Sequence, residues 1–429
     1  MKEFNKNDTV KLKIGNSLTI KEKLGEGGQG VVYRVELQGK EYALKWYTHE
    51  YSKKFYQNLD NNIKKGAPAK TFLWPLYITE WKDNRFGYVM ELRPPEYKDF
   101  SHFLLAKQRF ASLSSMINAA LQISNAFREL HRAGYSYQDL NDGNFFINPQ
   151  TGDVLICDND NVAPDGTNLG IAGKCRYMAP EVVLGKRKPN ADSDRFSLSV
   201  ALFMLLFGNH PLEGKLIASV PCMTDKNERR FYGSDPVFIF DPQDDRNRPV
   251  MGIHTNAIRR WPLFPIFVRE AFIHAFGKEC AHHPNKRNPE NEWQKLFIRL
   301  RDETVMCSCG NETFIDLSQS SSRCINCGKD LGKPLLLHVK NNRVVLFPQQ
   351  KIYACHLRPD NQDFLTVAGE VIQNKKNPSL WGIRNLTSDV WLATLPDGRQ
   401  LSVKTNEVIP VFKDIEIIFS GGTKAKIEE

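Results

Sequence analysis

A glycine-rich turn between two strand-like segments constrains the fold of this chain most strongly. Residues 25–30 read Gly-Glu-Gly-Gly-Gln-Gly, and short apolar and polar alternations flank them on both sides. Because strand residues follow the glycines, the segment predicts a hairpin, whereas a dinucleotide-binding turn would lead directly into a helix. Glycines let backbone N–H groups lie against phosphate oxygens, since no Cβ intervenes. At this point a plain turn is the alternative.

The strand that follows the hairpin ends in Ala43-Leu44-Lys45. A lysine at that position can reach phosphates that are held beneath the glycine turn. Apolar spacing further along the chain predicts helices and strands in alternation. We expect helices over residues 50–65, 112–132, 194–207, 266–276 and 289–301, and strands near residues 74–81 and 85–91.

A loop rich in Asp and Asn follows the second of these helices. It contains Asp139 and Asn144, and Asp158 ends the next apolar strand, 19 positions after Asp139. Two carboxylates and an amide on tight loops offer hard oxygen ligands, which suit Mg²⁺ carrying nucleotide phosphates. The alternative is that Asp and Asn simply occupy turns. A calcium loop beginning at Asp158 is excluded, because Val162 and Ala163 stand where a ligand and a glycine belong.

The order of these parts resembles the eukaryotic-like protein kinase family over residues 15–302. Further motifs follow in register: Tyr177-Met178-Ala179-Pro180-Glu181, Ser193-Asp194-Arg195-Phe196-Ser197, Gly208-Asn209-His210-Pro211 and Arg287. The resemblance implies an α+β, bilobal protein-kinase fold, in which Arg287 pairs with Glu181. The segment Met90-Glu91-Leu92-Arg93 is similar to the gatekeeper and the adenine-binding hinge.

The resemblance also implies roles for individual residues. Lys45 would contact the α- and β-phosphates of ATP, Asp139 would be the catalytic base, and Asn144 and Asp158 would bind Mg²⁺. The nucleotide would contact Gly25, Gly27, Gly28, Gly30, Val32, Ala43, Lys45, Glu91 and Arg93.

Five positions depart from the family pattern. Tyr137-Gln138 replace the usual His-Arg before Asp139, which removes the arginine that senses a phosphorylated activation loop. Asn141 replaces a lysine, so one positive charge near the transferred phosphoryl is missing. Asp160 replaces the glycine of the metal-binding triplet, and Lys174 replaces a threonine. We hypothesise that Lys174 supplies the charge that Asn141 lacks.

The minimal set for phosphoryl transfer, Lys45, Asp139, Asn144 and Asp158, is nevertheless complete. We therefore expect an ATP- and Mg²⁺-dependent protein kinase that transfers the γ-phosphoryl to Ser or Thr of a partner protein. The alternatives are an ATP-binding pseudokinase scaffold and a kinase-fold phosphotransferase for small molecules. The motif ending in Glu181 speaks against the latter. The acidic partner of Lys45 is not evident, and Asp60 is one candidate.

Control by loop phosphorylation is not expected. The segment from Asp158 to Glu181 is short, and Thr167 is its one candidate acceptor. Residues 213–262 form a longer, loop-rich stretch than such kinases usually carry there. We expect an ordered loop that covers the large lobe, with docking of a partner as the alternative to a structural role.

Two cysteine pairs, Cys307 with Cys309 and Cys324 with Cys327, stand 14 residues apart. Four thiolates form the tetrahedral ligand set that Zn²⁺ prefers, and a closed four-cysteine site is structural. The segment resembles a zinc ribbon, although its first pair is one residue shorter than the common spacing. Unliganded thiols and an iron–sulfur cluster are the alternatives.

Residues 334–425 predict several short strands with turn signals, which is typical of an all-β sandwich. Three segments, 381–387, Trp391 and 414–419, resemble a forkhead-associated domain. Such domains bind phosphothreonine, but the expected Gly-Arg is absent, and Tyr353-Ala354-Cys355-His356-Leu357 stands in its place. A fixed module that recruits or restrains the kinase is the alternative.

The whole arrangement resembles bacterial kinases of tellurite-resistance-associated phosphorylation triads, which would make a von Willebrand factor A protein and a metal-dependent phosphatase its partners. We expect four parts: residues 1–92 (kinase N-lobe), 93–302 (kinase C-lobe), 303–333 (zinc ribbon) and 334–429 (forkhead-associated-like sandwich).

The composition and the apolar runs of the chain argue against nucleic-acid binding and against a membrane span. The 58 Lys and Arg against 49 Asp and Glu give a net charge of +9, which we do not interpret as nucleic-acid binding. The most apolar run, residues 196–208, is shorter than the ~20 residues of a membrane span. No targeting segment is visible, and the nine scattered or clustered cysteines favour a reducing compartment. We expect a soluble, cytoplasmic protein without membrane contact.

Overall fold

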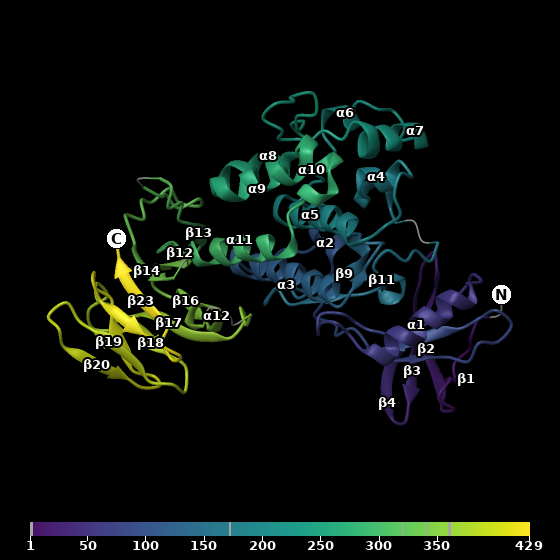
Figure 1. The fold of residues 1–429 in the computed structure, drawn as a ribbon, viewed down its shortest axis with the longest axis horizontal. Coiled ribbons are helices and arrows are strands. Elements are labelled where there is room, and N and C mark those ends of the chain that lie inside the picture. The colour runs from purple at the N-terminus through teal and green to yellow at the C-terminus, as the bar shows by residue number, and fades with distance from the viewer. Residues whose placement is uncertain (1–2, 171–172, 320, 341, 359–361) are drawn as a thin grey trace. The chain divides into compact units, whose positions relative to one another are not determined.

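The computed structural model describes residues 3–170, 173–319, 321–340, 342–358 and 362–429. The chain forms two compact units, whose helices and strands can be followed in Figure 1. The first unit contains Met1–Ala111, Gln122–Ile258 and Phe272–Asn291, and the second contains Ser112–Leu121, Arg259–Ala271 and Glu292–Glu429. Among the helices of the described ranges, none combines the length and the apolar character that crossing a membrane requires.

An antiparallel sheet with the strand order β1-β2-β3-β4-β6-β5 begins the first unit. Because side chains alternate along a strand, each face of this sheet has its own core. Val31, Tyr33 and Val35 of β3 are buried on one face, and Tyr47 and Tyr88 are buried on the other. The strands are β1 Thr9–Lys11, β2 Ser17–Glu26, β3 Gly30–Leu37, β4 Lys40–Tyr47, β5 Tyr77–Ile78 and β6 Gly87–Met90.

Helix α1 (Lys53–Lys65) packs against the second of these faces through Phe55 and Leu59. It begins at Ser52, whose hydroxyl accepts a hydrogen bond from the Phe55 N–H at 3.2 Å, and it ends at Gly66 with φ of 80°. Both ends follow the capping preferences of helices. The predicted helix over residues 50–65 is confirmed, whereas the strand expected over 74–81 is reduced to the two residues of β5.

The rest of the first unit is mainly helical and is built around α5 (Ala191–Phe207). This helix is buried almost all round, because its apolar residues follow no single face. Asn190 caps its start and Gly208, with φ of 67°, ends it. The buried helix predicted over residues 194–207 is therefore confirmed. Further helices along the chain are α2 Phe100–Leu104, α3 Leu113–Arg132, α4 Pro180–Val183, α9 Ile266–Phe276, α10 Lys278–His282 and α11 Glu290–Asp302.

Two short strand pairs flank the polar loops of the first unit. Strands β9 (Phe145–Ile147) and β10 (Val154–Ile156) pair antiparallel and are joined by β7 (Lys98–Asp99). Strands β8 (Tyr135–Ser136) and β11 (Ala163–Pro164) form a second pair. The loop after β8 leads to β9 and the loop after β10 leads to β11, so each loop connects one of these strand pairs to the other.

Residues 213–262 contain short helices as well as loops. They contain α6 (Lys215–Ala218), α7 (Asp225–Glu228), a π-helical turn over Arg229–Ser234 and α8 (Thr255–Arg260). Buried Asn247 holds the stretch together, because its amide donates to Leu212 O at 2.8 Å and to Val237 O at 2.7 Å. The stretch expected to form an ordered loop thus also contains short helices, of which α6 and α7 have no buried residue.

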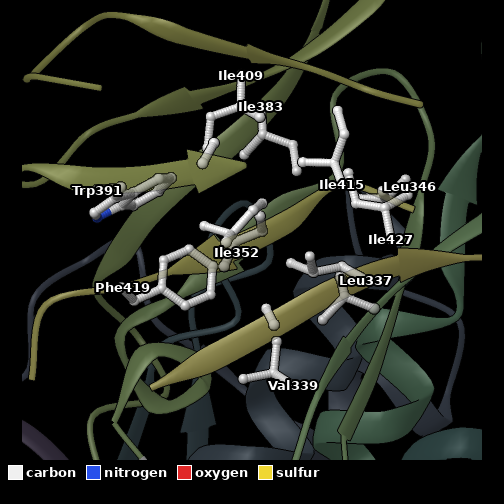
Figure 2. Close-up of a cluster of buried hydrophobic side chains, with 14 of the residues drawn as sticks. Leu337, Val339, Leu346, Ile352, Ile383, Trp391, Ile409, Ile415, Phe419 and Ile427 are labelled. Atoms are coloured by element: carbon white, nitrogen blue, oxygen red, sulfur yellow. The ribbon is translucent and has the colours of Figure 1, made fainter. Parts of the chain in front are cut away.

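The second unit contains an all-β sandwich. One sheet has the order β15-β14-β23-β22-β19-β20 and the other the order β16-β17-β18-β21. Figure 2 shows the core between them, which includes Leu337, Ile352, Ile383, Trp391 and Ile427. The strands are β14 Leu335–Val339, β15 Asn342–Leu346, β16 Lys351–Tyr353, β17 Val367–Gln373, β18 Trp381–Asn385, β19 Trp391–Thr394, β20 Gln400–Val403, β21 Val408–Pro410, β22 Glu416–Ile418 and β23 Lys424–Glu428.

A small hairpin of β12 (Thr304–Met306) and β13 (Glu312–Phe314) precedes the sandwich within the same unit. Its residues Val305 and Ile315 share a buried cluster with Leu336 and Val345 of β14 and β15. The Glu312 carboxylate also accepts hydrogen bonds from the N–H and the hydroxyl of Ser114, at 2.8 and 2.6 Å. Ser114 lies in the first turn of α3, where a negative charge is favourable.

Candidate active site

The glycine turn joins β2 to β3, and its glycines differ in what they allow. A Cβ on Gly30 would lie 2.4 Å from Trp46 O, so only glycine lets β3 approach β4 there. At Gly25, Gly27 and Gly28 an added Cβ would meet nothing within 4 Å. These three positions leave an open backbone face above the site, as a phosphate-binding turn requires.

Lys45 lies beneath this turn on β4, with its Cα paired to that of Val32 on β3. Its buried Nζ donates to Asp158 Oδ1 at 3.1 Å, to Asp160 Oδ2 at 3.0 Å and to Gln29 Oε1 at 2.9 Å. Burial alone would lower the pKa of Lys45, but the carboxylates of Asp160 and Asp158 outweigh it and raise that pKa above its ordinary value. The lysine therefore carries its charge at neutral pH.

Asp139 follows β8 on a loop that its own amides stabilise. Asn141 accepts a hydrogen bond from the Gly143 N–H at 3.0 Å, and the Asn141 N–H donates to Asn144 Oδ1 at 2.7 Å. The Asp139 carboxylate accepts from Asn141 Nδ2 at 3.3 Å and from Asn161 Nδ2 at 3.4 Å. These hydrogen bonds hold Asp139 and Asn144 on one ordered loop.

Burial raises the pKa of Asp139 to about 6, and the nearby charges of Asp158 and Asp160 act in the same direction. The Asn141 hydrogen bond and the positive charge of Lys174 oppose the rise. A carboxylate with such a pKa is a better proton acceptor than an ordinary aspartate and is still mostly ionised at neutral pH.

Asp158 stands at the end of β10 in the left-handed conformation, with φ of 54°. Its side chain is 44% exposed, and the Cys157 N–H donates to Asn144 O at 2.8 Å, which ties the two loops together. The buried Asn161 Oδ1 accepts no hydrogen bond from the described residues. Carboxylate and amide oxygens at this point fit Mg²⁺, and Asn144 and Asp158 would hold it.

The hinge residues lie at the edge of the same sheet. The Glu91 side chain is exposed and pairs with Lys40 at 3.0 Å. The Arg93 guanidinium covers the ring of Phe146 at 4.0 Å. Ala43 pairs with Met90 across β4 and β6. These residues provide the apolar and backbone groups that a flat heterocycle would contact.

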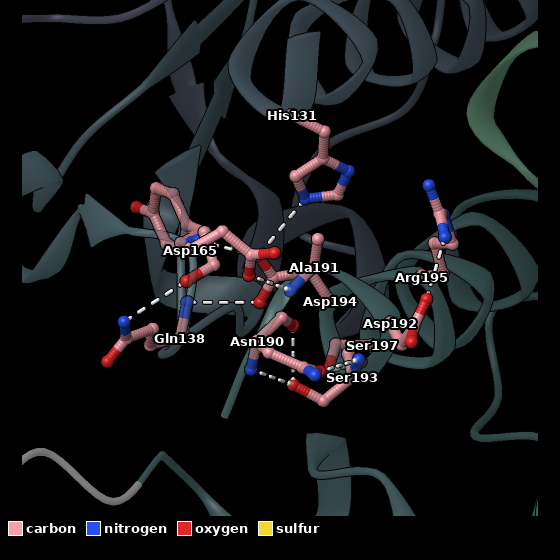
Figure 3. A network of polar contacts seen from close by, with 12 residues as sticks. His131, Gln138, Asp165, Asn190, Ala191, Asp192, Ser193, Asp194, Arg195 and Ser197 are labelled. Atoms are coloured by element: carbon pink, nitrogen blue, oxygen red, sulfur yellow. Dashed lines mark hydrogen bonds and ion pairs between the residues drawn. The ribbon is translucent and has the colours of Figure 1, made fainter. Parts of the chain in front are cut away.

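A buried ionic group fixes the catalytic loop on α5, as Figure 3 shows. Asp194 accepts the N–H groups of Tyr137 at 2.6 Å and of Gln138 at 3.0 Å, and it lies 3.1 Å from His131 Nε2. The other ring nitrogen of His131 contacts Glu290 at 2.7 Å. Sequence reasoning missed His131 and Glu290, because nothing in their local sequence distinguishes them from ordinary helix residues.

Burial would lower the pKa of His131, but Asp194 and Glu290 raise it to about 9. Burial likewise opposes ionisation of Glu290, and the His131 hydrogen bond and charge lower its pKa to about 2. The group is therefore a protonated imidazole between two carboxylates at neutral pH.

Gln138 occupies the position of the missing arginine and makes neutral contacts to the activation segment. Its amide donates to Thr167 O at 2.6 Å and to Ser136 Oγ at 3.1 Å. The segment is thereby held without a phosphate group. At its end, Arg287 pairs with both carboxylate oxygens of Glu181 at 2.8 and 2.7 Å, as the sequence predicts.

Lys174 lies next to the catalytic loop, 3.5 Å from Asp142 Oδ1. Asp60, in contrast, pairs with Lys13 and Lys64 at 2.9 and 2.7 Å and not with Lys45. The suggestion that Asp60 is the acidic partner of Lys45 is wrong, because the helix turns this carboxylate toward other lysines.

The four clustered cysteines of the second unit converge on one point. The sulfur atoms of Cys307, Cys309, Cys324 and Cys327 all lie within 4.8 Å of one another. The pairs Cys307–Cys327 and Cys309–Cys324 are both 3.8 Å apart, too far for disulfides. A tetrahedron of ~2.3 Å zinc–sulfur bonds has edges of about 3.8 Å. The Asn311 backbone N–H lowers the pKa of Cys309 to about 6, which favours the thiolate that a metal needs.

Comparison with known proteins identifies the class of the first unit. The family described as "Protein kinase domain" matches residues 18–233, half of the chain, and the protein therefore belongs to the protein kinase family. The predicted fold class is confirmed: a bilobal kinase fold of mixed helices and strands, followed by a cysteine cluster and an all-β sandwich.

Several serine/threonine kinases are similar in sequence. The probable serine/threonine-protein kinase gdt4 of Dictyostelium discoideum is 26% identical over 207 residues, which are 46% of this chain and 12% of that protein. Protein kinase C delta type of Rattus norvegicus is 28% identical over 212 residues, 46% of this chain and 30% of that protein. The chain thus spans less than a third of either relative. Among solved structures, the kinase domain of PknI from Mycobacterium tuberculosis covers 69% of this chain and 98% of its own, with 16% identity and a TM-score of 0.47.

Proposed function

We propose that this protein is an ATP- and Mg²⁺-dependent kinase that transfers the γ-phosphoryl group to a Ser or Thr hydroxyl of a partner protein. One observation carries the proposal: Lys45, Asp139, Asn144 and Asp158 converge on one site in which the pKa of Asp139 is raised to about 6. This combination provides charge for the phosphates, hard ligands for a metal and a proton acceptor.

Binding of the nucleotide would begin at the glycine turn. The open backbone at Gly25, Gly27 and Gly28 would donate to phosphate oxygens, and Lys45 would pair with the α- and β-phosphates. The adenine would lie between Val32, Ala43 and the hinge at Glu91 and Arg93, with Gly30 shaping the turn. Mg²⁺ held by Asn144 and Asp158 would neutralise the charge of the β- and γ-phosphates.

Transfer would then depend on Asp139. Its carboxylate accepts the proton of the substrate hydroxyl while the hydroxyl oxygen bonds to the γ-phosphorus and the bond to the β-phosphate oxygen breaks, which releases ADP. Asn141 orients Asp139 and carries no charge. Lys174, which is close enough to lower the pKa of Asp139, would supply the positive charge at this point.

The second unit would supply a structural zinc site and a recruiting module. Zn²⁺ held by Cys307, Cys309, Cys324 and Cys327 would fold residues 303–333, because so short a segment has little core of its own. The sandwich over residues 334–429 would act as a forkhead-associated-like domain. A von Willebrand factor A protein and a metal-dependent phosphatase are the partners we propose, with residues 1–92 and 93–302 as the kinase lobes.

In place of the usual arginine loop, the sandwich has a short helix, α12 (Ala354–Leu357). Its His356 is buried and contacts Asp302 at 2.9 Å. This side chain is therefore not free to bind a phosphate, which favours a fixed recruiting role over phosphothreonine recognition. A pull-down with residues 303–429 and a phosphothreonine peptide, against its unphosphorylated form, distinguishes the two roles.

The test of the catalytic proposal is transfer of ³²P from ATP by the full chain and by Asp139→Asn, with and without candidate partner proteins. We expect phosphorylation by the wild type and its loss, by about a thousandfold or more, in the variant. Nucleotide binding should be retained in both. A pseudokinase scaffold would bind ATP and give the same background signal in the two proteins.

A further inference from the structure

The buried ammonium group of Lys45 takes its acidic partners from outside the helix that packs on its sheet. In the described part of the chain, no ion pair joins Lys45 to a residue of α1. The one carboxylate of α1, Asp60, is engaged with Lys13 and Lys64. Lys45 instead contacts Asp158 and Asp160, 113 and 115 positions further along the chain.

These two aspartates differ in exposure, and the difference separates their roles. The Asp158 side chain is 44% exposed, whereas that of Asp160 is fully buried. An exposed carboxylate can leave the lysine and turn to a metal at little cost, because water replaces the contact. A buried carboxylate that lost its partner would be left as an uncompensated charge, which is strongly unfavourable.

Asp160 is held by a second side chain of the same strand. Lys45 and Tyr47 are two positions apart on β4 and therefore point to the same face. The buried Tyr47 hydroxyl donates to Asp160 Oδ2 at 2.5 Å, the same oxygen that Lys45 contacts at 3.0 Å. The neighbouring Asn159 anchors the turn by donating to Leu73 O and Ile156 O, both at 2.9 Å.

We propose that Asp160 is the positioning residue for Lys45, in the role that an acidic side chain on the neighbouring helix would otherwise have. The inference rests on the proposed function, in which Lys45 contacts the phosphates of ATP. Asp158 pairs with the lysine and would be one of the residues that hold the metal, whereas Asp160 would keep the lysine in place.

This arrangement orients Lys45 without a charged contact from α1. The helix contacts the same segment through neutral groups, since Asn58 and Asn62 both donate to Val162 O, at 2.8 and 2.7 Å. The lysine is instead fixed by the turn after β10. A kinase built in this way would not need an ion pair from that helix to place its lysine.

The first test measures nucleotide affinity in the full chain by isothermal titration calorimetry, so that no transfer is needed. Asp160→Asn keeps the size of the side chain and removes its charge. We expect the dissociation constant for ATP to rise about tenfold and, in assays of transfer, KM for ATP to rise more than kcat falls. Tyr47→Phe should act in the same direction by a smaller factor. Asp60→Asn is the matched control and should change neither value.

The second test is a double-substitution cycle on thermal unfolding without nucleotide. Lys45→Met should lower the melting temperature, because it leaves the buried Asp160 carboxylate without its positively charged partner. Adding Asp160→Asn to Lys45→Met should recover most of that loss. The proposal would be overturned if the two substitutions changed the melting temperature additively and if Asp160→Asn left the ATP affinity unchanged. A wild-type chain that binds ATP but transfers nothing would contradict the proposed function alone, since this cycle does not depend on transfer.

Discussion

At the scale of single residues, the loop that contains Asp139 has fewer charged side chains than the family pattern, and neutral hydrogen bonds hold it in place. Gln138 replaces an arginine, yet its amide still connects the loop to the activation segment through Thr167 O. Asn141 replaces a lysine and orients Asp139 through a hydrogen bond of 3.3 Å. A neutral amide can position a carboxylate but cannot stabilise a developing negative charge. In the proposed reaction another residue would supply this charge, and Lys174, whose charge lowers the pKa of Asp139, is the candidate.

The first prediction concerns Lys174. Its positive charge lowers the pKa of Asp139, so Lys174→Ala should raise that pKa above its value of about 6. The rate of transfer requires ionised Asp139, and we expect it to rise with pH through about 6 in the wild type and at higher pH in the variant. The transfer rate should also fall by tenfold or more while ATP affinity is kept.

The measurement is kcat against pH between 5 and 8, with ATP affinity measured separately. Lys188→Ala, which removes an exposed lysine outside the loop, is the control and should leave the profile in place. An unchanged rate and an unchanged profile in Lys174→Ala would show that this lysine has no part in the site.

At the scale of elements, helix α5 is the support on which the catalytic loop is built. Its Asp194 binds two consecutive backbone N–H groups of the loop and the ring of His131 on α3. Glu290, at the start of α11, contacts the other ring nitrogen of His131. Four separate segments thus depend on one buried ionic cluster, so that its protonation state bears on the stability of the unit.

The second prediction is a pH dependence of that stability. The pKa of His131 is raised from an ordinary value of about 6.5 to about 9 in the folded state. A raised pKa stabilises the fold fully below the unfolded value and less as pH rises through the folded value. We expect a loss on the order of 3 kcal/mol between pH 6.5 and 9. Glu290 acts at the other end, because its lowered pKa contributes stability that is lost as pH falls from about 4.5 to about 2.

Urea unfolding of the wild type and of His131→Gln at pH 6 and pH 9 tests this expectation. The variant should be less stable at pH 6 and should show a much smaller change between the two values. A wild-type difference that persists unaltered in His131→Gln would assign the pH dependence to other groups.

At the scale of the whole molecule, each compact unit has its own means of support. The first relies on two apolar sheet faces and the buried α5. The second relies on the sandwich core and on a cysteine cluster, in which Cys307 and Cys309 of the β12–β13 hairpin meet Cys324 and Cys327. The cluster formed by Val305, Ile315, Leu336 and Val345 links that hairpin to the sandwich sheet, so metal binding and sheet stability should be connected.

The third prediction is that removal of zinc loosens this part of the second unit. A strong chelator should release one zinc ion per chain and increase hydrogen exchange in β12 and β13, with a smaller increase in β14 and β15. Cys324→Ser should produce the same exchange pattern without chelator. Cys222→Ser, which alters an exposed cysteine outside the cluster, is the control. A chain that holds no zinc and whose exchange is unaffected by chelator would contradict the assignment.

The sequence by itself determined the fold class, because motifs such as the glycine turn, the Asp139 loop and the four cysteines consist of residues that lie close together in the sequence. Their spacing can be recognised without knowledge of the fold. It also predicted the pair of Arg287 and Glu181, through the order of motifs in the resembling family. The long helices were predicted for the same reason, since apolar periodicity and capping residues act locally.

The tertiary structure alone decided the charged partners of Lys45 and His131. Asp160 contacts Lys45 across 115 positions, and His131 contacts Glu290 across 159. Neither pair has a local signal, because an aspartate in a turn or a histidine in a helix usually faces water. Burial is what turns these residues into fixed partners: a charge removed from solvent must find an opposite charge, and which one it finds is set by how distant segments pack.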